Sequence, residues 1–431
     1  MASPFNAETQ RTQRGAERLS AFPLRAPRHA GAGLRLRVES LFAAIAVLWL
    51  CGCLLAGELP PARVGVYVWS GQAPGQAPAA HGELTAAAGE QRRFGFGAMR
   101  IFLGGRYDYL HPLRSPERFA GVARPLTLAR ILALPRFKSL LERPELRTLW
   151  LTAYPVFDYG QGPDEIDLRR PVSEAEWRRE YDQLYEAAVW LYANFGGRDK
   201  VVLISNHEAD EKLLEILNAG GAPELAMGNV ARDLEVRFRA VSDARRKFPA
   251  ARLKVLFGAE ISLWKLKLAP APGGKWVKAG QGWNALEAVL PRLSFDFVSF
   301  SAWEIVAQAD VPAALRAALD DIGQRTRPRV SQAGRALFGD SHVLIGEFGY
   351  AREWKLAAGA PGAGVDAFLN AVERGRVPYA VYWQLYDNTE GDVKGFGLVD
   401  GAGRITCSGV ALFRRLRAAA PPAAQVSCAV Q

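Results

Sequence analysis

Residues that bind metals or form disulfide bonds are scarce in this sequence. It has 4 cysteines and 5 histidines in 431 residues, with no CxxC motif and no cluster of Cys and His. A structural zinc site needs such ligands at short spacing, so no metal site is expected. Cys51 and Cys53 lie in a hydrophobic run. Cys407 and Cys428 could form a disulfide in an oxidising compartment or remain two free thiols.

The usual signatures of nucleotide and nucleic-acid binding are also missing. No GxGxxG motif follows the first predicted strand, which counts against a dinucleotide-binding fold, and no cofactor is expected. The formal net charge is +10, but residues 1–40 carry seven arginines against three glutamates and supply +4 of it. No dense basic patch interleaved with aromatic residues occurs in the rest of the chain. The composition therefore predicts a solvated surface and no nucleic-acid partner.

Only one long hydrophobic run is present, over residues 41–57 (LFAAIAVLWLCGCLLAG). Seventeen residues in a helix cover about 25 Å, the short end of what spans a bilayer. An Arg-rich leader (1–40), expected to be disordered, indicates that the run is an export signal or an uncleaved anchor. Lipidation at Cys53 is a less favoured alternative. The expected protein is membrane-anchored, with residues 64–420 in a periplasmic or other extracytoplasmic compartment and 421–431 as a tail.

Eight short hydrophobic runs alternate with amphipathic stretches. The runs lack polar alternation, as parallel strands buried on both faces do, and cover 64–69, 98–103, 148–152, 200–205, 253–257, 295–300, 342–346 and 379–383. Helices are predicted around 126–142, 173–195, 223–247, 283–292, 311–325, 364–374 and 409–418. Segments rich in Gly, Pro and Ala at 71–93 and 153–172 are predicted to be loops. This order predicts an α/β protein with a single (β/α)8 TIM barrel.

Carboxylates and aromatic residues follow the predicted strands, at the rim where such barrels carry their active sites. The candidates are Arg100, Tyr154, Asn206, His207, Glu208, Glu260, Trp303, Glu304, Glu347, Trp383 and Asp387. Glycoside chemistry uses two carboxyl groups, one of which must stay protonated near neutral pH. Aromatic rings stack on sugars and polar side chains bind their hydroxyls. The pattern therefore favours a sugar-active site without excluding structural roles for each residue.

The motifs that carry these residues resemble clan A of the retaining glycoside hydrolases, the cellulase- and mannanase-like barrels, over roughly residues 64–420. The resemblance implies that Glu347, in Ile-Gly-Glu-Phe-Gly after the seventh strand, is the nucleophile and that Glu208, after the fourth, is the acid/base. It implies that Arg100 supports the nucleophile and that Trp383 forms a floor for the sugar. The other expected substrate-binding residues are Tyr154, Asn206, His207 and Trp303.

The fourth strand departs from the family pattern by one residue. Family members have Asn-Glu there, whereas this sequence has Asn206-His207-Glu208. Because side chains alternate faces along a strand, the extra residue would turn Glu208 away unless the strand end bulges. Glu260 and Glu304 are therefore kept as alternative carboxylates. A barrel that has lost catalysis and binds glycan as an envelope structural or assembly protein is a second interpretation.

Two other chemistries remain open. A transglycosylase would pass through the same covalent intermediate and differ only in its acceptor site. A metal-dependent enzyme would need histidines among matched ligands, and besides His207 the sequence offers His342 at a strand start. The sugar, the linkage and the oligomeric state do not follow from the sequence.

Overall fold

A computed structural model of the chain describes residues 63–68, 82–104, 127–154, 166–352, 361–387, 395–417, 421–422 and 426–427. The predicted leader, the hydrophobic run at 41–57 and Cys428 lie outside these residues. Among the residues that are described, no helix is long and apolar enough to cross a membrane.

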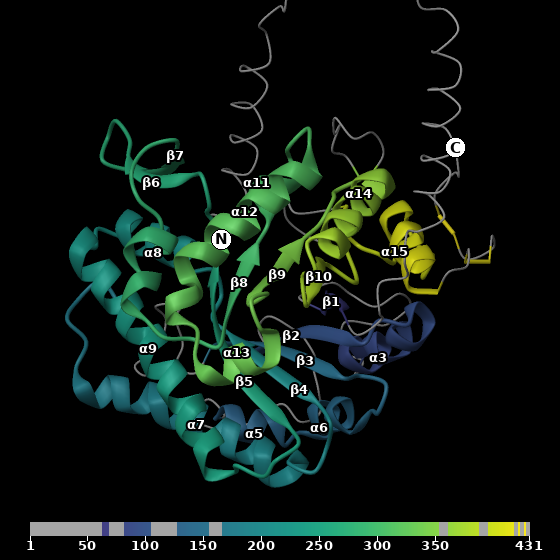
Figure 1. The fold of residues 1–431 in the computed structure, drawn as a ribbon, viewed down its shortest axis with the longest axis horizontal. Coiled ribbons are helices and arrows are strands. Elements are labelled where there is room, and N and C mark those ends of the chain that lie inside the picture. The colour runs from purple at the N-terminus through teal and green to yellow at the C-terminus, as the bar shows by residue number, and fades with distance from the viewer. Residues whose placement is uncertain are drawn as a thin grey trace, which may run out of the picture.

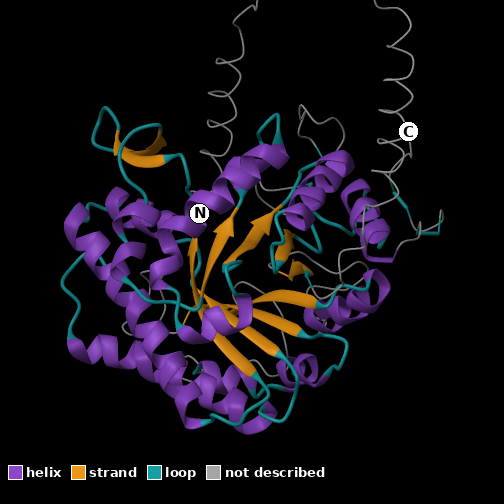
Figure 2. Ribbon diagram, in the orientation of Figure 1, coloured by secondary structure: helices purple, strands orange, loops and turns teal. Residues whose placement is uncertain are grey.

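Eight parallel strands close into a barrel, in the spatial order β1-β10-β9-β8-β5-β4-β3-β2 (Figure 2). The strands are β1 Val64–Val68, β2 Ala98–Gly104, β3 Thr148–Tyr154, β4 Val201–Ser205, β5 Lys254–Ile261, β8 Phe297–Ser301, β9 Val343–Phe348 and β10 Ala380–Trp383. Each of the eight predicted strands is confirmed, with ends shifted by a few residues. The prediction of a single (β/α)8 barrel is confirmed with them.

Helices surround the barrel and pack on the outer faces of its strands (Figure 1). They are α3 Gly82–Phe94, α5 Leu128–Leu132, α6 Pro135–Glu142, α7 Glu174–Phe195, α8 Ala209–Asn218, α9 Pro223–Lys247, α10 Ala285–Ala288, α11 Trp303–Val306, α12 Val311–Thr326, α13 Gln332–Phe338, α14 Pro361–Arg374 and α15 Cys407–Arg417, with 3-10 turns η2 Leu290–Arg292 and η3 Arg327–Arg329. The start of α7 carries the predicted capping box, in which Ser173 and Glu176 bond to each other's backbone amides.

The loop prediction for 71–93 is wrong where the structure describes it, because residues 82–94 form α3. Leu84, Ala87, Ala88 and Phe94 recur at helical spacing and are buried against the barrel, a pattern hidden by the Gly and Ala content of the segment. A second unpredicted feature is the antiparallel hairpin of β6 Lys267–Pro270 and β7 Trp276–Ala279. It follows β5 and projects beyond the strand ends beside α8 (Figure 1).

One large residue from each strand fills the barrel interior. These residues are Tyr67, Arg100, Trp150, Leu203, Leu256, Phe297, Leu344 and Val381, and each has 2% or less of its surface exposed. Arg100 is the one charged member of this set. Its guanidinium lies 4.5 Å from the ring centre of Tyr67 and 5.3 Å from that of Trp150, so both rings help to compensate its burial.

Candidate active site

Arg100 organises the upper end of the barrel interior. Its Nη2 lies 2.8 Å from Oε1 of Glu260, and its Nη1 lies 3.4 Å from Oε1 of Glu347. Its Nε donates to the Thr152 hydroxyl, and Nη1 also donates to the carbonyl of Gly346. The guanidinium is therefore fixed from four sides and holds two carboxylates in place.

Glu260 is the buried ion-pair partner of Arg100. Besides Arg100, its carboxylate accepts hydrogen bonds from the hydroxyls of Ser299 at 2.7 Å, Ser301 at 3.2 Å and Ser205 at 3.3 Å. Four donors satisfy a carboxylate, and Glu260 has no exposed surface. Glu260, predicted as an alternative to Glu208, therefore helps to hold Arg100 in position.

A bulge in β9 turns Glu347 into the interior. Between β9 and β8, Ile345 pairs with Phe300 and Glu347 with the very next residue, Ser301, so Gly346 is the extra residue. A Cβ on Gly346 would lie 2.1 Å from the Ser299 hydroxyl and 3.0 Å from Arg100 Nη1, so Gly346 also faces inward. A bulge lets two successive residues share one side. Phe348 then points outward, where its ring stacks on Phe368 of α14 at 4.2 Å.

The Glu347 carboxyl lies in a buried, partly compensated setting. Its Oε2 accepts a hydrogen bond from Trp303 Nε1 at 3.3 Å, and 4% of the residue is exposed. Burial raises the pKa of Glu347 to about 7, while Arg100 pulls it down and Glu260 pushes it up. The sequence analysis expected Trp303 to contact sugar, and its bond to Glu347 was not foreseen.

Glu208 is the N-cap residue of α8, beyond the end of β4. The strand stops at Ser205, so the alternation that would turn Glu208 away does not extend to it. The residue is 1% exposed, and its Oε1 has no hydrogen-bond partner within the described part of the chain. Burial first, and then the charge of Glu347, raise the pKa of Glu208 well above its usual range. The two carboxyls are thus close enough to interact electrostatically.

Three aromatic rings gather beside Glu347. Trp303 meets Trp383 edge-on with ring centres 5.8 Å apart, and Phe396 lies 5.8 Å from Trp303 and 5.0 Å from Trp383. Trp383 ends β10, 8% of it is exposed, and the Trp383–Gln384 peptide bond is cis. Phe396 was missed in the sequence because it follows no predicted strand.

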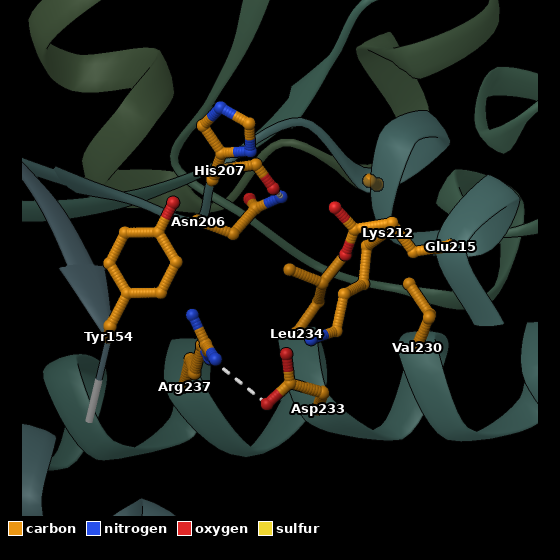
Figure 3. A pocket seen from close by; sticks show the side chains of 10 residues that line it. Tyr154, Asn206, His207, Lys212, Glu215, Val230, Asp233, Leu234 and Arg237 are labelled. Atoms are coloured by element: carbon orange, nitrogen blue, oxygen red, sulfur yellow. Dashed lines mark hydrogen bonds and ion pairs between the residues drawn. The ribbon is translucent and has the colours of Figure 1, made fainter. Parts of the chain in front are cut away.

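Tyr154, Asn206 and His207 lie apart from this cluster. They line a cavity of about 30 Å³ between the ends of β3 and β4 and helices α8 and α9, with Asp233 and Arg237 on its far wall (Figure 3). Asn206 accepts from the backbone N–H of Glu260 at 2.8 Å and donates to its carbonyl at 3.3 Å. Its amide therefore ties β4 to β5.

Four other polar residues at the strand ends have structural bonds. Glu304 accepts from the backbone amides of Trp264, Lys265 and Leu266 and thereby holds the start of the hairpin segment. Asp387 accepts from the Gly395 amide and pairs with Arg352 at 2.7 Å. Asp210 and Glu211, which follow Glu208, were missed. Asp210 accepts from the amides of Ser262, Leu263 and Ala285, and Glu211 pairs with Lys278 of the hairpin.

In the part of the chain that the structure describes, no three His, Cys, Asp or Glu side chains lie close enough together to bind one metal ion. His342 lies at the opposite end of the barrel from Glu347, with its Nε2 2.8 Å from the Thr326 hydroxyl.

Comparisons with known proteins bear on the fold alone. No family model and no curated protein matches the chain. Among solved structures, an exo-β-1,4-mannosidase from Opitutaceae bacterium strain TAV5 is 16% identical with a TM-score of 0.48, over 83% of this chain and 59% of that one. A broad-specificity endoglucanase from Clostridium longisporum is 12% identical with a TM-score of 0.46, over 83% and 96%. The barrel itself is shown by the strand order of the structure.

Proposed function

We propose that this protein is a retaining glycoside hydrolase acting on β-linked glycans, with Glu347 as nucleophile and Glu208 as acid/base. The observation that carries the proposal is that two buried carboxyls at the same end of the barrel differ in how many cations and hydrogen-bond donors contact them. Glu347 has Arg100 and the Trp303 N–H, while Oε1 of Glu208 has no such donor. A double displacement needs one charged and one protonated carboxyl, and this asymmetry supplies them.

The protonation order follows from the neighbours of each group. A cation and a hydrogen-bond donor stabilise the ionised form of Glu347, so it loses its proton first. Its negative charge then holds the proton on Glu208, whose own pKa burial has already raised. Glu347 would attack the anomeric carbon while Glu208 protonates the departing glycosidic oxygen. In the second step Glu208 would take a proton from the water that releases the sugar.

The proposal extends to the class of substrate and to the location of the protein. Trp303, Trp383 and Phe396 offer an aromatic surface beside Glu347 suited to a pyranose face. The hydrophobic run at 41–57 favours attachment to a membrane and an envelope or extracellular polysaccharide as substrate. Transfer to a second sugar instead of water would use the same two carboxyls.

Turnover of aryl β-glycosides and a panel of β-glucans and envelope polysaccharides tests the proposal. Glu347→Gln and Glu208→Gln should each lower kcat by several orders of magnitude while the far-ultraviolet spectrum stays that of the wild type. Azide should restore turnover of an activated substrate to the variant that lacks the acid/base. Full activity of either variant would refute its assigned role.

A glycan-binding barrel without catalysis is the second candidate. It is favoured by Asn206, whose amide nitrogen already donates to the carbonyls of Glu260 and His207 and whose amide oxygen accepts from the Glu260 N–H. This candidate predicts that wild type and Glu347→Gln bind the same glycan equally and that neither cleaves it. Turnover by the wild type would dismiss it.

A further inference from the structure

Exposed cations mark the strand starts, on the face of the barrel opposite Glu347. Parallel strands share one entry face. An exposed Lys or Arg lies within four residues of the start of five of the eight strands, and a sixth, Arg329, bonds to Phe295 just before β8. These are Arg63 at β1, Arg147 at β3, Arg198 at β4, Lys254 at β5, Arg329 beside β8 and Arg376 before β10. The six residues are called the basic face below.

Backbone bonds confirm that these residues share one end of the barrel. The Arg63 carbonyl accepts from the N–H of Ala380, and the Arg147 carbonyl accepts from the N–H of Val201. Phe295, just before β8, donates its N–H to the carbonyl of Arg329. The basic face therefore follows from strand register and does not depend on the conformation of a long loop.

The acidic residues of this face do not neutralise it. Asp199 pairs with Arg252, Glu145 with Arg143 and Asp340 with Arg327, all of which are additional arginines. Within the described residues, none of the six members of the basic face makes an ion pair at 4 Å or less. The three buried carboxylates Glu208, Glu260 and Glu347 lie at the other end of the strands, away from the basic face.

The hydrophobic run at 41–57 ends only a few residues before the basic face. Residue 63 enters the barrel at the basic face, and six residues separate Gly57, the end of the hydrophobic run, from Val64. A chain of that length reaches at most about 25 Å. If the run is held in a membrane, as proposed above, the basic face is the part of the barrel kept nearest to the lipid.

We propose that the basic face docks on a membrane surface rich in anionic lipid headgroups and turns the Glu347 end away from it. Each cation near such a surface gains about a fivefold factor in binding, and the attraction fades within a Debye length of roughly 10 Å. Six cations spread around one end suit a broad charged surface. A site for a single small anion would instead require several of these side chains to point at one position.

A competing explanation is that each cation of the basic face stabilises the helix end next to it. Barrel helices end on the same face as the strands begin, and a helix C-terminus favours nearby cations. On that explanation the cations stabilise the fold and bind nothing. The two explanations differ in whether charge removal changes lipid binding or thermal stability.

The test uses the full chain with residues 41–57 replaced by a Gly-Ser sequence of equal length, so that any attachment depends on the rest of the protein. It is sedimented with vesicles of phosphatidylcholine, alone or with 30% phosphatidylglycerol, in about 0.1 M and 0.5 M salt. The variant is Arg147→Gln/Arg329→Gln/Arg376→Gln. The matched control, Arg179→Gln/Arg316→Gln/Lys275→Gln, removes the same charge from exposed sites elsewhere.

We expect binding to the anionic vesicles only, its loss in high salt, and about a hundredfold weaker binding for the first variant with little change for the control. Equal binding to neutral vesicles would overturn the proposal. So would equal weakening by both variants, or no lipid binding with a lower melting temperature for the first variant. Binding to dextran sulfate or duplex DNA but not to vesicles would overturn it in favour of a polyanion. No glycoside is turned over in this assay, so its failure would leave the proposed hydrolase untouched.

Discussion

Replacing Glu347 by glutamine is expected to stabilise the folded protein at pH 8 and to change its stability little at pH 5. Burial raises the pKa of Glu347 from 4.5 to about 7. Between these values the folded protein holds a proton that the unfolded chain has released. The contribution of this carboxyl to stability is therefore complete below pH 4.5 and falls as the pH rises through 7. Glutamine, which does not ionise, avoids that loss.

The size of the effect follows from the shift. A difference of 2.5 pKa units corresponds to at most about 3 kcal/mol, fully expressed above pH 7. For a barrel of this size that is a rise of about 4 °C in the melting temperature. Glutamine has the same shape, and its amide oxygen can accept from Trp303 or Arg100 as the carboxylate does. Arg100 keeps its 2.8 Å pair with Glu260, so no buried charge is left unpaired.

The assay is thermal unfolding of wild type and Glu347→Gln at pH 5, 6, 7 and 8, and it needs no substrate. Glu176→Gln serves as a control of opposite sign, because Arg170 and Ser173 lower the pKa of Glu176 to about 2. That variant should lose stability by a similar amount at all four pH values, because Glu176 stays ionised over this range in both the folded protein and the unfolded chain. If Glu347→Gln melts below the wild type at pH 8, or if the difference between them is the same at pH 5 and 8, the environment inferred for Glu347 is wrong.

Three further predictions concern the same cluster. Trp303→Phe removes a long hydrogen bond to ionised Glu347 that is worth about 1 kcal/mol. The acid limb of the pH profile of kcat/KM should therefore move up by roughly 0.5–1 pH unit, and an unmoved limb would mean that the bond does not act on Glu347. Arg100→Met leaves Glu260 buried without its cation and should lower the free energy of unfolding by roughly 3–5 kcal/mol. Urea titrations measure this loss, and a loss below about 1 kcal/mol would contradict the pairing of Arg100 with Glu260. Gly346→Ala places a methyl group 2.1 Å from the Ser299 hydroxyl, so we expect a less stable protein with a large loss of kcat. A melting temperature and a kcat like those of the wild type would show that the bulge tolerates a side chain.

The strand pattern could be predicted because burial on both faces leaves a plain signal. Parallel barrel strands appear as unbroken hydrophobic runs, and all eight lie where the sequence placed them, with boundaries moved by a few residues. The helix at 82–94 was missed because Leu84 and Phe94 are its only large hydrophobic residues among those described as buried, and two of the others are alanines, which carry little hydrophobic contrast. The hairpin at 267–279 was missed because it adds to a loop and extends no barrel strand.

The local geometry of the two carboxylates could not be predicted in the same way. From side-chain alternation alone, an inward Glu208 required a bulge at the end of the fourth strand. The structure has a bulge at the seventh, where Gly346 lets Glu347 face inward. Side-chain alternation describes a strand only while the strand lasts, and β4 ends at Ser205. Which way Glu208 turns is decided by the first residues of α8, and no hydrophobic period encodes that.

The buried carboxylates Glu208, Glu260 and Glu347 differ in how completely their oxygens are satisfied by hydrogen bonds and cations, and this difference argues for the proposed roles. Glu260 receives four donors, Glu347 receives a cation and one N–H, and Oε1 of Glu208 receives none. Donors and cations stabilise charge, so a proton shared between Glu208 and Glu347 rests on Glu208. A barrel that only bound glycan would gain nothing from keeping an unsupported carboxyl buried next to a charged one, because that arrangement lowers stability above neutral pH. Selection for proton transfer gives a reason to retain it.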